Sequence, residues 1–399
     1  MSKLSRLLPG DPAPELRLSR GLVEDVLQPV VSDQLRLVVL WNGGCPGCLP
    51  FIRDLAEISA SHGVPCYGVA VMVIHVDRTA VKAKSIPSKA VLALEERTPE
   101  ASVLSRGWVT RHWLEASGQD GVPAGFIVDR TNRIAWMGPA THIEPILKRI
   151  LRGEWNIDAA RTEWQAKVSD DSVRLLQYRR DILEATVTGG VATASSLVKQ
   201  AETELPSALG DAEFNILKLQ TIVDGPDPDD HATRFYIEAS DRFPTDVDAQ
   251  MRLAAVIVRD MPLNMEALKA VLDRLQRVER QWRSSTEADR PFLIFQVRLH
   301  LTIAEAAQRI GETAECERQI ERASLLGHDT RLDDAHRNVA ADESARIRRL
   351  RHEARIASRS GMAPADDPSE TEGENRAGIS CRTASCTAAA GNGDIAAPL

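Results

Sequence analysis

The stretch Trp41–Phe51 reads WNGGCPGCLPF and follows directly on the apolar run RLVVLW. That run is typical of a buried strand, because it is short and rich in branched apolar residues. A strand, a glycine-rich turn and then a cysteine predict that Cys45 lies at the N-terminus of the next helix. Pro46 suits the first helical position, where its missing N–H costs no helical hydrogen bond. The sequence therefore predicts that Cys45 and Cys48 lie one turn apart at a helix start.

Two thiols at this spacing form a redox pair, half of a metal site or a buried structural pair. A zinc site needs a second ligand pair, and the sequence has no other CxxC and no histidine at a zinc-module spacing. Proline and glycine between the cysteines suit a helix start more than a helix interior. We favour a redox pair, in which the helix dipole and free N–H groups stabilise a thiolate at Cys45, the nucleophile. Cys48 is then the resolving thiol, and no metal or cofactor is expected.

Composition narrows the class of protein. The chain has 399 residues, a formal charge of −8 and six cysteines. The negative charge argues against general binding to nucleic acid or to an anionic membrane. The start, MSKLSRLLPG, has no apolar stretch typical of a signal peptide, and no later stretch is long enough to span a bilayer. We therefore expect a cytoplasmic protein, in which cysteines do not form a disulfide framework.

The tryptophans divide the chain. Six of the seven lie in the first 164 residues, and the following two hundred residues are rich in Ala, Leu, Arg and Glu. We expect an α/β domain over 1–154, an all-α region of helical hairpins over 155–355 and a disordered tail over 356–399, which is too polar to form a core.

Hydrophobic patterning predicts individual elements. Strands are expected within 36–41, 67–76, 124–130 and 133–138. After residue 154 no strand is expected, and helices are expected at Asp171–Thr186, Asp246–Asp260, Met265–Trp282, Pro291–Ile310 and Thr313–Leu326.

A second stretch, GQDGVPAGFIVDRTNRIAWMG, helps to assign the cysteine motif of Trp41–Phe51 to a family. Taken alone, its Val-Pro could be an ordinary trans bond at a strand entry. Together with CPGC, the chain resembles thioredoxin-fold thiol-disulfide oxidoreductases of the TlpA and redoxin type over about residues 8–152. Members of that family have a tryptophan four residues before the first cysteine, here Trp41. They also have a segment G-(I/V)-P-x-x-F-(I/V)-(I/V)-D, here Gly121–Asp129.

The resemblance implies a thioredoxin-like domain, with a central mixed sheet flanked by helices. It also implies that the cysteine pair lies next to a cis-proline whose neighbouring backbone pairs with the substrate chain. The residues expected to bind substrate are Val122, Pro123, Trp41, Pro46 and Gly47. The helical half is loosely similar to the helical extensions of some redoxin proteins, and the segment RIGETAECERQIERASLLG has tetratricopeptide-like packing positions.

The chain departs from the family at the motif itself. Val39 occupies the position where a carboxylic acid usually handles the proton of the resolving thiol, so that proton must use water or another group. His75 and Asp77 are the nearest candidates, but we favour the alternative that both leave the sheet into a solvated loop. Gly44 replaces the tryptophan that usually precedes the first cysteine. The usual dipeptide is inverted to Pro46-Gly47, and a proline in that position occurs in oxidising members of the superfamily. We therefore expect a more oxidising couple than that of thioredoxin.

The remaining cysteines carry weaker signals. Cys66 is expected to be a buried hydrophobe and Cys316 a structural or partly exposed thiol. Cys381 and Cys386, in the polar tail, are either incidental or able to oxidise each other.

The sequence thus predicts a thiol-disulfide oxidoreductase that acts on protein or small-thiol clients and exchanges electrons with a cellular thiol reductant or oxidant. Its helical region would bind a protein partner. The alternative is a helical scaffold or adaptor whose redoxin domain senses redox state or is catalytically weak.

Overall fold

The computed structural model describes most of the first 352 residues. The described residues are 5–23, 30, 33–45, 48–85, 88–97, 106–284, 293–329, 337, 340–349 and 351–352. Among the expected site residues Pro46 and Gly47 lie outside this set, as does the tail at 356–399 with its two cysteines. Contacts between residues divide the described chain into two compact units, which meet between Arg180 and Asp181. The domain boundary expected after residue 154 remains a prediction.

The first unit is built on a six-stranded mixed sheet. Its strands are β1 (Leu18–Gly21), β2 (Arg36–Trp41), β3 (Cys66–Ala70), β4 (Val91–Glu95), β5 (Ala124–Val128) and β6 (Ile134–Pro139). Their order across the sheet is β1-β4-β3-β2-β5-β6. Strands β2, β3 and β4 are parallel, whereas β1, β5 and β6 run antiparallel to their neighbours. The four predicted strand regions each contain a strand, and β1 and β4 are additional.

Helices cover both faces of this sheet. The helices of the first unit are α1 (Cys48–Ser61), α2 (Val76–Ser85), α3 (Ile143–Leu151), α4 (Ile157–Lys167) and the first part of α5 (Asp170–Val187), together with a π-helical segment, Thr110–Glu115, and a 3-10 turn, Ala140–His142.

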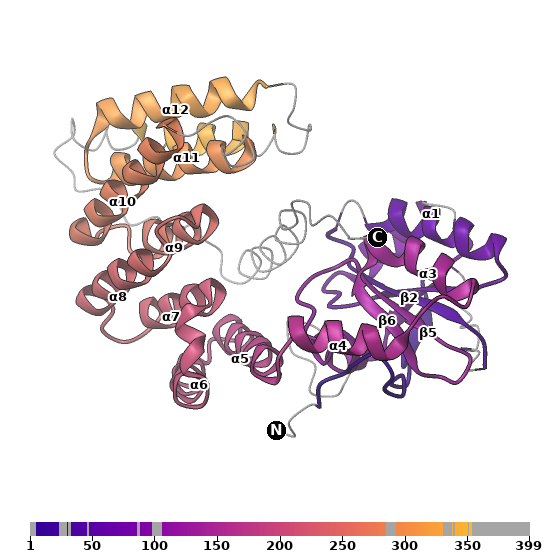
Figure 1. The fold of residues 1–399 in the computed structure, drawn as a ribbon. Coiled ribbons are helices and arrows are strands. Elements are labelled where there is room, and N and C mark those ends of the chain that lie inside the picture. The colour runs from indigo at the N-terminus through magenta and orange to yellow at the C-terminus, as the bar shows by residue number, and fades with distance from the viewer. Residues whose placement is uncertain are drawn as a thin grey trace. The chain divides into compact units, whose positions relative to one another are not determined.

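The register of the sheet shows which helices share a face. Val39 pairs with Gly68 on one side and Gly125 on the other, so these three residues face the same way. Ile52 of α1 packs over Gly68, and Ile143 of α3 packs over Gly125. Helices α1 and α3 therefore cover one face (Figure 1).

The other face is covered by the π-helical segment. Trp113, in that segment, meets Phe126 of β5 edge to face, with ring centroids 5.2 Å apart. Phe126 pairs with Val38, the neighbour of Val39, and therefore points to the opposite face from Val39. A mixed sheet with flanking helices, which the sequence led us to expect, is confirmed.

The second unit is helical. It contains the end of α5, then α6 (Val191–Glu204), a 3-10 turn (Pro206–Gly210), α7 (Ala212–Val223), α8 (Asp229–Arg242), α9 (Val247–Asp260), α10 (Met265–Ser284), α11 (Leu293–Arg309) and α12 (Thr313–Gly327). The five expected helices are present with small differences at their ends, and α6, α7 and α8 are additional. Beyond Pro139 no described residue belongs to a strand. None of the described helices combines the length and apolar character needed to cross a membrane.

Candidate active site

Strand β2 delivers the first cysteine through a tight turn. All six residues of the strand are buried, and the chain leaves the sheet after Trp41. The Cys45 N–H donates to the Asn42 carbonyl oxygen at 3.0 Å, and the Gly44 N–H donates to Asn42 Oδ1 at 2.8 Å. A short polar side chain that accepts a bond from the backbone two residues later stabilises such turns. We call Asn42–Cys45 the redox loop.

The two cysteines are joined in a disulfide at the start of α1. Their Cα atoms lie 5.5 Å apart. Cys45 is half-buried, whereas Cys48, the first residue of α1, is completely buried. Of the two, Cys45 is therefore the residue that an incoming thiol or disulfide can reach.

Asn42 also ties the redox loop to the neighbouring strand. Its Nδ2 group donates to the carbonyl oxygens of Val71 and Met72, at 2.8 and 2.9 Å, just beyond the end of β3. Together with the bond to Gly44, the side chain makes three hydrogen bonds. The Asn42 side chain thus stabilises the turn of the redox loop and also binds that loop to the chain that follows β3.

Helix α2 holds the redox loop from another side. The Lys82 ammonium group donates to the Gly43 carbonyl oxygen, and Thr79, buried on the same helix, packs against Gly43. A Cβ atom on Gly43 would lie 2.5 Å from Thr79 Oγ1, so this approach requires glycine. Lys82 therefore places a positive charge on the carbonyl group two residues before Cys45.

A buried carboxyl lies at the same edge of the sheet. Glu95 ends β4, and its side chain accepts hydrogen bonds from the Met72 N–H at 2.9 Å, the Thr110 N–H at 2.7 Å and the Thr110 hydroxyl at 2.7 Å. Burial raises the pKa of the Glu95 carboxyl, and hydrogen bonds from Thr110, Met72 and Gly107 oppose that shift. Glu95 thus holds Met72, to which Asn42 is bonded.

The two candidate proton acceptors for the resolving thiol lie in exposed positions, which agrees with the favoured alternative of a solvated loop. His75 and Asp77 are exposed, one just before α2 and the other in its first turn. Val39 is completely buried. Glu95 is a buried acid at the carboxyl edge of the three parallel strands, and sequence reasoning missed it.

The segment before β5 lies next to the end of β2. Leu40 pairs with Ala124, so β5 begins beside the end of β2. The Val122–Pro123 peptide bond immediately before β5 is cis. Val122 is buried and Pro123 half-buried, and the Pro123 carbonyl oxygen accepts from the Ala140 N–H at 3.0 Å. We call residues 118–123 the docking loop.

Trp41 differs from the other expected substrate-binding residues. It is completely buried in the core, and its indole N–H has no hydrogen-bond partner among the described residues. Its ring offers no surface to a substrate in this conformation, so any influence on docking would pass through the residues that cover it.

Sequence reasoning missed Asn42, Thr79, Lys82 and Glu95 as parts of the site. One local signal was available for Asn42, because asparagine before two glycines is typical of a side-chain-stabilised turn. The other three carry no local signal, since each reaches the loop through tertiary packing.

The other described cysteines are not part of the disulfide. Cys66 and Cys316 are free and buried, as expected for Cys66, and burial raises the pKa of the Cys66 thiol to about 12. Among the described residues there is no group of three or more His, Cys, Asp and Glu side chains that could hold a metal ion.

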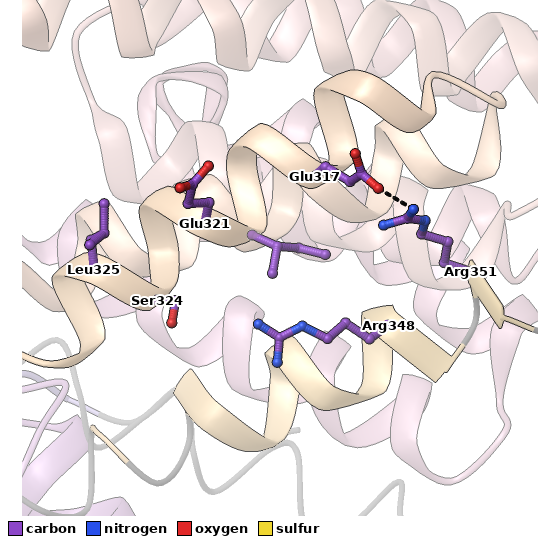
Figure 2. Close-up of a pocket in the computed structure, with 7 residues that line it drawn as sticks. Glu317, Glu321, Ser324, Leu325, Arg348 and Arg351 are labelled. Carbon is purple, nitrogen blue, oxygen red and sulfur yellow. Dashed lines mark hydrogen bonds and ion pairs between the residues drawn. The ribbon is translucent and has the colours of Figure 1, made fainter.

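The helical unit has a hollow of its own. It has a volume of about 350 Å³ and lies between α12 and the helical residues 340–349 and 351–352. Figure 2 shows Glu317 and Glu321 along α12 and Arg348 and Arg351 on the facing segment, with an ion pair between Glu317 and Arg351. The walls of this hollow therefore carry both signs of charge.

Comparison with known proteins gives distant relatives. No protein-family model matches the chain. It is 25% identical over 153 residues to Protein FixW of Rhizobium leguminosarum, a match that covers 37% of this chain and 67% of FixW. A crystal structure described as a thiol:disulfide interchange protein DsbE from Chlorobium tepidum is 18% identical, with a TM-score of 0.28, over 37% of this chain and 99% of that one.

Proposed function

We propose that this protein is a thiol-disulfide oxidoreductase that works through Cys45 and Cys48. The observation that carries the proposal is the disulfide at the start of α1, with its first cysteine accessible and its second completely buried. An accessible thiolate beside a buried partner suits sequential exchange through a mixed disulfide. The cis Val122–Pro123 bond beside the end of the same strand adds support.

The reaction moves two electrons between a dithiol and a disulfide. In the oxidised protein, a client thiolate attacks the Cys45 sulfur, and Cys48 leaves as a thiolate that takes up a proton. A second client thiol then loses its proton and attacks the client sulfur of the mixed disulfide, which releases the Cys45 thiolate. The client has gained a disulfide, and the protein is left with two thiols. A cellular thiol oxidant must then restore the pair, whereas in the reverse direction a reductant is required.

The motif further supports an oxidising couple, because the Pro-Gly dipeptide lies within the pair and Lys82 and the start of α1 favour the reduced thiolate. We expect a reduction potential above that of thioredoxin, about −270 mV. Equilibration with glutathione redox buffers measures it. A reduction potential at or below that of thioredoxin contradicts the oxidising assignment, but it leaves the proposal of thiol-disulfide exchange through Cys45 and Cys48 intact.

The decisive experiment traps the client. A Cys48→Ser variant, which retains Cys45 but lacks the resolving thiol, is expected to accumulate mixed disulfides on Cys45 in cells. A Cys45→Ser variant serves as the matched control and is expected to accumulate none and to lose insulin-reduction activity. Recovery of no thiol-linked species from Cys48→Ser, with wild-type protein inactive on insulin, would contradict the proposal and favour a scaffold or adaptor role.

For the helical unit we propose a partner-binding platform of hairpins, within a cytoplasmic protein. The hollow between α12 and residues 340–349 and 351–352 supports this, because its mixed charges suit a polar side chain of a protein partner. An Arg348→Glu variant is expected to lose a partner that co-purifies with wild type and to keep insulin reduction, and co-purification from cells measures it. Unchanged partner recovery contradicts this placement.

A further inference from the structure

The approach to the docking loop is packed against helices that follow the sheet in sequence. Gly118 has a φ of +73°, and a Cβ atom there would overlap Val168, just before α5. One residue earlier, the Ser117 carbonyl oxygen accepts a hydrogen bond from the Trp164 indole at 3.1 Å. The segment between α4 and α5 is itself held, because Arg6 donates to the Val168 carbonyl oxygen at 2.6 Å.

Two arginines of α5 form hydrogen bonds with the next part of the loop. Arg179 donates to Asp120 Oδ2 at 2.5 Å, and Arg180 donates at 2.8 Å both to Asp120 Oδ1 and to its backbone carbonyl oxygen. Arg180 is buried, with 9% of its side chain exposed, whereas the Asp120 side chain is 44% exposed. Such charge-assisted bonds on both side chain and backbone fix a loop position more strongly than a single surface ion pair.

The charge state of Asp120 supports this contact. Burial by itself would raise the pKa of the Asp120 carboxyl, but the guanidinium groups of Arg179 and Arg180 outweigh it, and the pKa is lowered. Asp120 is therefore ionised throughout the neutral range and keeps both partners.

The held residue lies two positions before Val122. Docking of an extended client requires the backbone at Val122 and Pro123 to be in place when the client arrives. A loop that must first be ordered loses affinity by the free energy of that ordering. The arginines thus lie where they can lower the ordering cost of docking.

We propose that Arg180 and Asp120 are positioning residues for client docking, and that α5 is the brace of the docking loop. The inference rests on the proposed function. If Arg180 and Asp120 act in this way, the redox site is completed by a helix that follows the last strand of the sheet in sequence. The part of α5 that carries Arg179 and Arg180 belongs to the first unit, so the contact lies within that unit.

The test separates docking from chemistry in the full-length chain. Arg180→Gln is expected to raise KM for insulin about tenfold, the factor that corresponds to one further backbone residue to be ordered, with kcat within about twofold by the same reasoning. Arg180→Lys, which keeps the charge, is expected to recover part of the affinity. Lys167→Gln is the control, since Lys167 forms an exposed ion pair with Glu163 on α4.

A double-mutant cycle identifies the pair. If the two residues act through each other, the rise in KM of Asp120→Asn combined with Arg180→Gln should be smaller than the product of the two single rises. Additive effects, or an unchanged KM in Arg180→Gln, overturn the inference while the exchange activity of wild type stands.

Hydrogen exchange keeps the proposal testable without activity. Amides of residues 118–122 and 124 are expected to exchange faster in Arg180→Gln than in wild type, with β6 unchanged as an internal reference. Equal rates overturn the brace. If wild-type protein proves inactive on every disulfide, the proposed function fails, and faster exchange in the variant would still establish the brace as a structural element.

Discussion

The redox loop and the docking loop meet at the same edge of the sheet but are held in different ways. The redox loop is fixed by its own Asn42 and by contacts 29 to 39 residues away, all inside the part of the chain that builds β2, β3 and α2. The docking loop is fixed by Trp164, Arg179 and Arg180, which lie 47 to 60 residues later. The nucleophile is thus organised by the sheet, and the docking edge by helices added to it.

Because the two loops are held by different elements, substitutions in those elements should affect one loop at a time. Under the proposed function, a change in α4 or α5 is expected to alter how a client is held and to leave the environment of Cys45 untouched. A change in Asn42 or α2 alters the sulfur chemistry and leaves the docking edge in place. Substitutions in each loop and in the residues that hold it test whether the two loops are held independently.

The largest effect is expected for Gly118→Ala in the docking loop. The added methyl group overlaps Val168, and the new alanine must keep a positive φ that is unfavourable for it. The free energy of unfolding of the first unit should therefore fall by roughly 2 to 4 kcal/mol. Urea unfolding followed by tryptophan fluorescence measures it, because six of the seven tryptophans precede residue 165.

Gly153→Ala is the matched control for this substitution. Gly153 has a φ of +74° and open space around its Cα, so it isolates the backbone cost from the clash. Adding Val168→Ala to Gly118→Ala should relieve only the clash. If Gly118→Ala costs no more than Gly153→Ala, the packing of the loop against Val168 is not a constraint.

The next effect is expected for Asn42→Ala in the redox loop. The variant loses three hydrogen bonds, including two to carbonyl groups beyond β3, and should lower the free energy of unfolding by about 2 kcal/mol. Alkylation of Cys45 by iodoacetamide in the reduced protein should change as well, since the turn that presents the sulfur is loosened.

Asn156→Ala provides the comparison, because this helix cap makes one such bond, to Ala159 at 2.9 Å. It should cost about 1 kcal/mol and leave alkylation of Cys45 unaltered. Equal alkylation rates in Asn42→Ala and wild type would refute the role of Asn42 in the redox loop.

Smaller, opposite effects are expected from the two carboxyls that serve the two loops. The pKa of Glu95 is raised in the folded protein, so the folded state retains a proton that the unfolded chain has lost above about pH 4.3, and stability falls as pH rises from there to the folded-state pKa. The pKa of Asp120 is lowered, so its contribution is present above about pH 3.9 and is lost as pH falls through the folded-state pKa.

Urea midpoints measured from acid to neutral pH distinguish them. The stability difference between wild type and Glu95→Gln should shrink as pH rises, whereas that between wild type and Asp120→Asn should grow. Slopes of the same sign in both variants would show that one of the two carboxyls is in a different environment from that described.

The smallest effect is expected for Lys82→Met. Its ammonium group is exposed and screened by solvent, so alkylation of the reduced Cys45 at neutral pH and low salt should slow only about twofold. Lys82→Arg should remain near wild type, and Lys84→Met, two residues along the same helix, is the control. A difference that persists unchanged in 1 M salt would argue against an electrostatic origin.

Local sequence was sufficient for the elements with strong patterns. The run RLVVLW became β2, the segment after Pro123 became β5, and the helices from α9 to α12 lie where their periodicity placed them. Strand β4 was missed because VLALE is made of residues that serve a helix equally well. Strand β1 was missed because LSRG is short and half polar, as suits its position at the edge of the sheet.

The sequence by itself indicated a cysteine pair at a helix start, because strand, turn and helix start are consecutive in the chain. It also indicated the cis-proline, through a motif of adjacent residues. Tertiary structure decided what holds these parts. Asn42 donates to two carbonyl groups just beyond β3, Lys82 donates to the Gly43 carbonyl oxygen, and the Glu95 carboxyl accepts from the Met72 N–H. Arg180 donates to the Asp120 carboxyl. A polar side chain can bond many groups, and only the packing of elements far apart in sequence selects the one it meets.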